Sequence, residues 1–103
     1  IAASLMNYRI HISCRNTRRH GWTYISEFAS TPPEPGFANN QSVFAVALDG
    51  SGTVERFAHE HHSSSLDYVH EPQAVPNHNG DRVVFASDWG AGGPVYDYVA
   101  REF

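Results

Sequence analysis

The chain has 103 residues and a formal net charge of −4, and 41% of its residues are hydrophobic while 17% are charged. This balance excludes an intrinsically disordered chain, and the length suits one small domain. The acidic charge argues against a nucleic-acid partner, because phosphate binding needs a basic surface. No apolar run approaches the roughly 18 residues of a membrane helix, so no membrane span is expected.

Aromatic residues make up 13% of the chain, and aromatic side chains suit the half-buried surface of a sheet. We therefore expect an all-β fold. Cys14 is the single cysteine, so no internal disulfide can form, and we interpret it as a small buried residue. Because the chain begins at Ile1 rather than Met, we interpret it as part of a longer protein.

The first half of the chain reads as four strands, expected at 9–14, 22–28, 42–48 and 53–59. The first of them alternates, with Ile10 and Ile12 on one face and His11 on the other face, toward polar surroundings. A proline-rich loop at 29–41 separates the second strand from the third. The turn after the first strand carries three arginines that we expect to be solvated: Arg15, Arg18 and Arg19.

The second half continues with a polar, histidine-rich loop at 60–70. A short apolar run, Gln73 to Val75, then meets a turn that contains Asn79-Gly80, a pair that tolerates positive φ and is typical of hairpins. Further strands are expected at 82–87 and 94–100, with a loop opened by Asp88-Trp89-Gly90 between them.

The two halves look like copies of one unit. Tyr24-Ile25-Ser26 followed by an acid matches Phe85-Ala86-Ser87 followed by an acid. Four antiparallel strands per repeat are typical of a β-propeller blade. We therefore predict two consecutive blades of a larger ring, one over 9–59 and one over 71–103, with the second lacking its outer strand and with 60–70 as the connecting loop.

The stretch PQAVPNHNGDRVVFASDWGAGGPVYDYV resembles the TolB-type, WD-like propeller repeat of bacteria, with Pro76 to Asp81 in place of that family's turn. The combination of His11-Ile12-Ser13 with the final Ser-Asp-Trp-Gly is similar to the C-terminal blades of propeller polysaccharide lyases of the oligogalacturonate and ulvan types. The resemblance implies β-elimination on an acidic, uronate-containing polysaccharide, and a periplasmic or secreted parent protein. The alternative is a non-catalytic propeller module that binds protein or glycan.

In the blade arrangement, the loops at one end of the sheets form the binding face. The predicted catalytic residues are His11 and His70, since lyases need proton transfer beside a carboxylate. The predicted substrate-binding residues are Tyr68, Glu71, Gln73 and Trp89. For each of these residues the alternative is a structural role in packing or capping, or a solvated side chain.

His59, His61 and His62 form a group that could hold a divalent metal ion, because imidazole suits several transition metals. The alternative is a solvated loop, since the spacing matches no closed zinc motif. The expected partners are the remaining blades of the parent chain and a polysaccharide or oligosaccharide.

Overall fold

The computed structural model describes residues 8–29, 42–61, 71–90 and 93–101. These residues form strands and no helix, so none of them belongs to a helix that could cross a bilayer. The strands are β1 (Tyr8–Ser13), β2 (Trp22–Ala29), β3 (Ser42–Ala47), β4 (Val54–His59), β5 (Val75–Pro76), β6 (Arg82–Ser87) and β7 (Tyr96–Arg101).

The strands form two antiparallel sheets in which neighbours in sequence are neighbours in space. The first sheet has the order β1-β2-β3-β4 and the second has the order β5-β6-β7. The all-β prediction is confirmed, and each expected strand is present within two residues of its predicted bounds, although the fifth is only two residues long. There, Gln73 adopts a positive φ of 46°, so extended pairing starts only at Val75.

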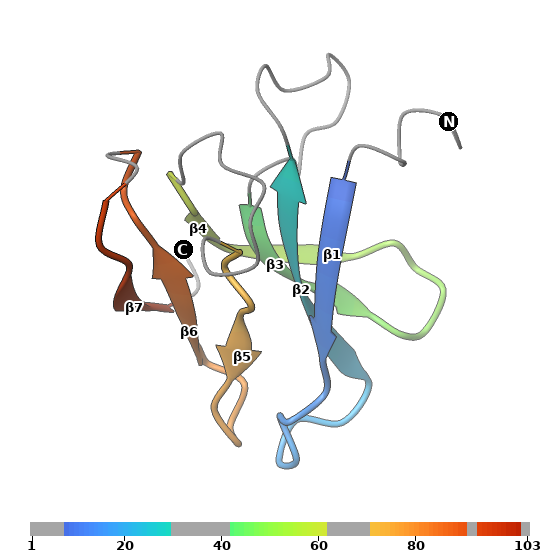
Figure 1. Cartoon of the computed structure of the whole chain (residues 1–103). Coiled ribbons are helices and arrows are strands. Elements are labelled where there is room, and N and C mark those ends of the chain that lie inside the picture. Colours follow the sequence, from blue (N-terminus) through green and yellow to red (C-terminus); the bar gives the residue numbers. More distant parts are fainter. Residues whose placement is uncertain (1–7, 30–41, 62–70, 91–92, 102–103) are drawn as a thin grey trace.

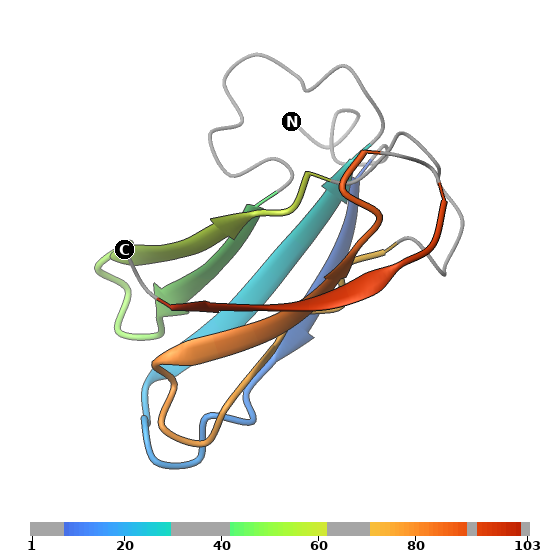
Figure 2. The same cartoon turned by 90° about the vertical axis from the view of Figure 1, so that its left-hand side faces the viewer.

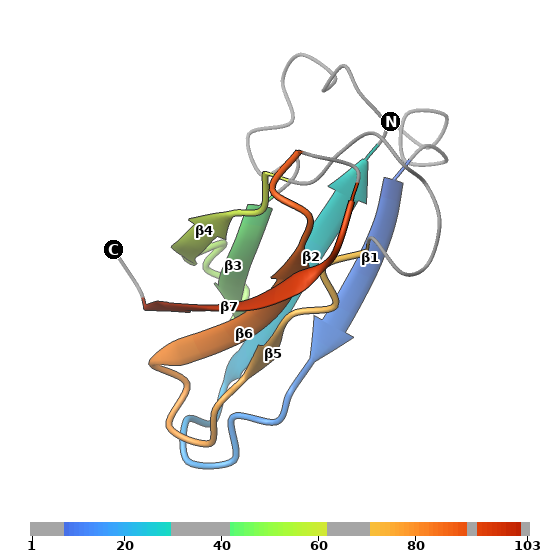
Figure 3. The same ribbon diagram turned by 60° about the vertical axis from the view of Figure 1, so that its left-hand side comes forward.

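The two sheets pack face to face, with β1 beside β5 and β4 beside β7 (Figures 1, 2 and 3). One hydrophobic core lies between them. Tyr24 and Phe57 of the first sheet contact each other with ring centroids 5.6 Å apart. The buried members of this core are Tyr24, Val43, Ala45, Phe57, Ala74, Val83 and Phe85.

The side-chain directions correct an expectation for β1. Ile10 and Ile12 are 51% and 61% exposed, whereas His11 is half-buried on the face of β1 that it shares with Ser26. That face points to the second sheet, since Ser26 Oγ accepts a hydrogen bond from the backbone N–H of Ala74 at 3.1 Å. The apolar face of β1 is therefore the outer one, and His11 lies on the face that is turned toward the second sheet.

Tyr24 and Phe85, which the sequence overlay equates, both point into the core between the sheets. In a propeller, neighbouring blades are related by a rotation about the ring axis, so equivalent side chains point in the same direction around the ring. If Tyr24 and Phe85 were equivalent, one of them would therefore point away from the space between the two sheets. The overlay is therefore wrong at the level of single residues, and the propeller repeat stays a prediction at the level of strands.

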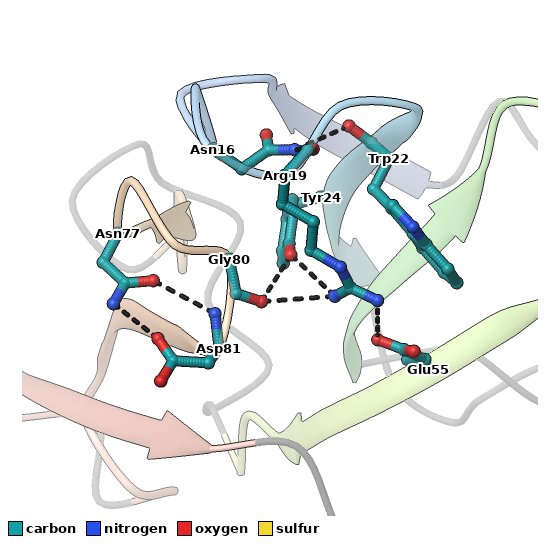
Figure 4. Close-up of polar contacts among 8 residues, drawn as sticks. All are labelled: Asn16, Arg19, Trp22, Tyr24, Glu55, Asn77, Gly80 and Asp81. Atoms are coloured by element: carbon teal, nitrogen blue, oxygen red, sulfur yellow. Dashed lines mark hydrogen bonds and ion pairs between the residues drawn. The ribbon is translucent and has the colours of Figure 1, made fainter.

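A polar network joins the sheets at the end where β1, β3 and β5 finish, which we call the turn end (Figure 4). The Tyr24 hydroxyl donates to the carbonyl of Gly80 at 2.5 Å. The guanidinium of Arg19 donates to the Tyr24 hydroxyl at 3.0 Å and to Glu55 Oε2 at 2.6 Å, and it lies 4.1 Å from the centroid of the Trp22 ring. The prediction of a solvated Arg19 is wrong.

Asn16 shapes the turn that presents Arg19 to this network. Its buried amide donates to the carbonyls of Arg19 and Trp22, which lie 2.7 and 3.0 Å away. On the other sheet, Asn77 bonds to Asp81 and closes the turn that carries Gly80. Cys14, at the start of the first turn, is exposed, so the expectation that it is buried is wrong.

Both outer faces carry exposed apolar side chains. On the first sheet these are Ile10, Ile12 and Val54, and on the second sheet they are Val75, Val84 and Val99. Val75, Val84 and Val99 are directly opposite one another across β5, β6 and β7, so they form one continuous row.

Candidate functional site

The candidate site lies at the opposite end of the sheets, which we call the loop end. It is built from the last residue of β4 and of β6 and the residues that follow each strand, namely 59–61 and 87–90. Figure 1 shows β2 and β6 pointing toward this end, away from the β1–β2 and β5–β6 turns.

Ser87 ties the two segments of the loop end together. Its hydroxyl donates to the carbonyl of Glu60 at 2.5 Å and accepts from the backbone N–H of Trp89 at 2.9 Å. Asp88 Oδ1 accepts from the N–H of Gly90 at 3.0 Å, which is the hydrogen bond of an Asx turn. The sequence Ser-Asp-Trp-Gly thus builds a tight turn that holds Trp89 beside the end of β4.

Trp89 and His61 contact each other across these segments, with ring centroids 4.4 Å apart. Both residues have a positive φ, 53° and 52°, which is uncommon for side chains of this size and costs on the order of 1 kcal/mol each. Trp89 is nevertheless 51% exposed. Strained backbone beneath an exposed tryptophan is more typical of a binding site than of packing alone.

The Trp89–His61 pair extends into a longer row of rings. The ring of Tyr98 lies 4.9 Å from that of Trp89, and the ring of His59 lies 6.3 Å from that of His61. We call His59, His61, Trp89 and Tyr98 the aromatic row. It is anchored in the core because Tyr98 also stacks on the buried Phe85 at 5.8 Å.

Carboxyl groups, rather than guanidinium groups, lie next to the aromatic row among the described side chains. Glu60 is fully buried, and burial, together with the charge of Glu27, raises the pKa of its carboxyl well above the usual range. Burial also raises the pKa of Glu27. Asp88 is buried within the turn that holds Trp89.

The guanidinium groups of the described side chains lie elsewhere. The chain has no lysine, so its cations are arginines and histidines. Six arginine side chains are described, and none of them belongs to the residues of the loop end: Arg15, Arg18, Arg19, Arg56, Arg82 and Arg101. The described part of the loop end therefore offers aromatic and carboxyl groups and the imidazoles of His59 and His61.

The predicted substrate-binding and catalytic residues that the structure describes are His11, Glu71, Gln73 and Trp89. Trp89 belongs to the aromatic row, whereas Gln73 lines a small pocket of about 180 Å³ on the second sheet, with Pro72 and Val84. Glu71 is half-buried. His11 lies between the sheets, and its Nδ1 is buried without a hydrogen-bond partner among the described residues. Tyr68 and His70 lie outside the described residues.

The predicted metal ligands are only partly described. His59 and His61 lie in the aromatic row, and His59 Nδ1 is 3.5 Å from Ser42 Oγ. His62 lies outside the described residues. Within the described part of the chain, no three His, Cys, Asp or Glu side chains are grouped in a way that could hold a metal ion.

Sequence reasoning missed two features of the site. Glu60 reads as one more polar residue of a loop, and only the fold shows that it is buried. Tyr98 reads as an ordinary strand residue, since period-two alternation places it on the face opposite Val99 but does not show which face is covered. Comparison with protein-family models, with curated proteins and with solved structures found no match to this chain.

Proposed function

We propose that this chain is a glycan-binding unit that contacts a sugar ring through the aromatic row at its loop end. The observation that carries the proposal is the exposed Trp89, held by strained backbone and by rings on neighbouring segments. Sugars present C–H surfaces that pack on aromatic rings, and a tryptophan that is fixed in advance loses little conformational entropy on binding.

The charges near the aromatic row support the binding module over the lyase. A lyase that acts on uronates needs cationic groups for the substrate carboxylate, and a proton-transfer group beside it. The described residues of the loop end include no arginine, and they carry the carboxyl groups of Glu60 and Asp88 beside the imidazoles of His59 and His61. His11, the predicted proton-transfer residue that is described, lies between the sheets. These features favour a sugar without a carboxylate and a non-catalytic role.

We also propose that the two sheets pack against further sheets of a larger protein, as blades of a propeller would. The sequential strand order of both sheets supports this proposal, and so do the exposed apolar side chains on their outer faces.

The glycan proposal is tested by screening the purified chain against an array of neutral and uronate-containing oligosaccharides, followed by titration calorimetry on the best ligand. We expect Trp89→Ala to weaken binding about tenfold or more, because the contact with the indole is lost. Leu48→Ala is the matched control, since Leu48 is 62% exposed at the turn end. Equal affinities of the wild type and Trp89→Ala would contradict the proposed site, as would the absence of binding to every sugar.

A further inference from the structure

The second sheet ends in a strand that is paired on one side only. Among the described residues, β7 has β6 as its one neighbour, whereas β3 of the first sheet has strands on both sides. An unpaired edge presents a row of backbone N–H and C=O groups, and natural proteins shield such edges or use them for pairing. The edge of β7 is therefore a candidate interaction surface.

The outward-facing residues of β7 form a self-complementary pattern. Asp97, Val99 and Arg101 alternate with Tyr98 and Ala100, which pack toward the core. Asp97, Val99 and Arg101 are all exposed, and Val99 is 67% exposed. Asp97 and Arg101 each lie two residues from Val99. Reversing the direction of the strand therefore exchanges the positions of the acid and the base.

This pattern fits a second copy of the same strand. Two antiparallel strands related by a twofold axis through Val99 place Asp97 of each copy directly opposite Arg101 of the other. The two Val99 side chains then face each other on the axis. Opposite charges at directly opposed positions stabilise an antiparallel pair, and like charges destabilise it. A shift by two residues in either direction loses both ion pairs.

The charges on β6, which pairs with β7 in the same chain, also favour a second copy at the free edge. Arg82 of β6 lies directly opposite Arg101, so two like charges are adjacent on the outer face. Among the described residues, Asp81 is an acid near both arginines, and it also accepts a hydrogen bond from Asn77 at 2.7 Å. A carboxylate on the free side of Arg101 would offset this repulsion, and Asp97 of a second copy supplies it.

We propose that two copies of this chain associate through antiparallel pairing of their β7 edges, centred on Val99, to give one continuous six-stranded sheet. The contact is isologous, as expected for a twofold dimer. The row Val75, Val84 and Val99 of one copy then continues into the same row of the other, across the outer face of the joined sheet. Binding of sugar at the loop end plays no part in this contact.

The test is a charge exchange measured by sedimentation velocity on the full chain. The wild type is expected to sediment as a dimer, with twice the 11.4 kDa mass of one chain. Asp97→Arg alone and Arg101→Asp alone each place like charges opposite each other twice, so the dissociation constant should rise about tenfold or more. The double variant Asp97→Arg with Arg101→Asp restores both pairs and should dimerise like the wild type.

Mixing the two single variants gives the sharpest readout. Each one alone is expected to be monomeric at a concentration where the mixture forms heterodimers, because in the mixed pair every opposed position again joins an arginine to an aspartate. Asp49→Arg, a charge reversal at the exposed β3–β4 turn, is the matched control and should leave dimerisation unchanged. Circular dichroism verifies that every variant is folded. A monomeric wild type, or association that ignores these exchanges, would overturn the proposal.

Discussion

Glu60 lies in an environment that disfavours the ionised form of its carboxyl group. Its carboxyl is fully buried, and both burial and the charge of Glu27 raise its pKa in the folded chain. A group whose pKa is raised on folding binds its proton more tightly in the folded state than in the unfolded state. The stability that this proton confers is fully present below the ordinary glutamate pKa of 4.5, and it is lost as pH rises through the raised value.

The variant Glu60→Gln should remove this loss, because the amide keeps the shape of the protonated acid. We expect the wild type to lose stability relative to Glu60→Gln as pH rises from about 5 to 8, as followed by urea unfolding at each pH. Glu27→Gln, which removes the neighbouring charge, should give an intermediate slope. Parallel stability curves for the three proteins would refute the role of Glu60.

At the scale of elements, the turn that contains Gly80 locks the two sheets together. Gly80 has a φ of 70°, and a Cβ there would meet the Tyr24 hydroxyl and lie 2.7 Å from Cδ of Arg19. A side chain at this position therefore carries both backbone strain and a clash with the network in Figure 4.

We expect Gly80→Ala to lower the free energy of unfolding by about 2–3 kcal/mol, measured by urea denaturation. Gly50→Ala is the matched control, because Gly50 has a φ of 82° but no atom lies within 4 Å of the place that its Cβ would take, so strain alone should cost about 1 kcal/mol. Equal losses in the two variants would show that the clash with Tyr24 and Arg19 contributes nothing.

The strands are the part of the fold that the sequence predicts best. Period-two alternation and turn residues such as Asn79-Gly80 are local properties, so β6 is predicted at its observed bounds. The contacts between sheets are not local. Nothing near Arg19 in the sequence indicates that its guanidinium donates hydrogen bonds to Glu55 and to the carbonyl of Gly80. A group of three arginines instead indicates a solvated turn.

The site is predictable to the extent that it depends on a turn. Asp88-Trp89-Gly90 indicates a loop that presents a tryptophan, and in the structure that tryptophan is half exposed. Its contact with His61 depends on how the end of β4 meets the end of β6, so only the fold reveals it. His11 misleads because period two gives two faces but does not say which of them is covered.

At the scale of the whole molecule, two apolar outer faces bound a single core. Isolated exposed apolar side chains are ordinary, but Ile10 and Ile12 are neighbours on one face of β1. If that face packs against a further sheet in a larger protein, polar substitutions there should affect association and leave the core between the sheets intact.

We expect Ile12→Thr to lower the binding of a hydrophobic dye and the aggregation of the isolated chain, while the urea midpoint changes little, because Ile12 is 61% exposed and threonine keeps β propensity. Val43→Thr is the contrasting variant, since Val43 is fully buried and its substitution should destabilise the fold. If Ile12→Thr binds as much dye as the wild type, the outer face of β1 is not the surface that binds the dye and causes aggregation.

The hydrogen bond between Tyr24 and Gly80 also bears on the order of events in folding. Each sheet joins strands that are close in sequence, whereas this bond links residues 56 positions apart. Closing so long a loop costs more chain entropy than closing a hairpin, so the sheets can form before the bond does. During that interval the inner faces of both sheets are open to solvent, and their exposure ends when the turn of Gly80 reaches Tyr24.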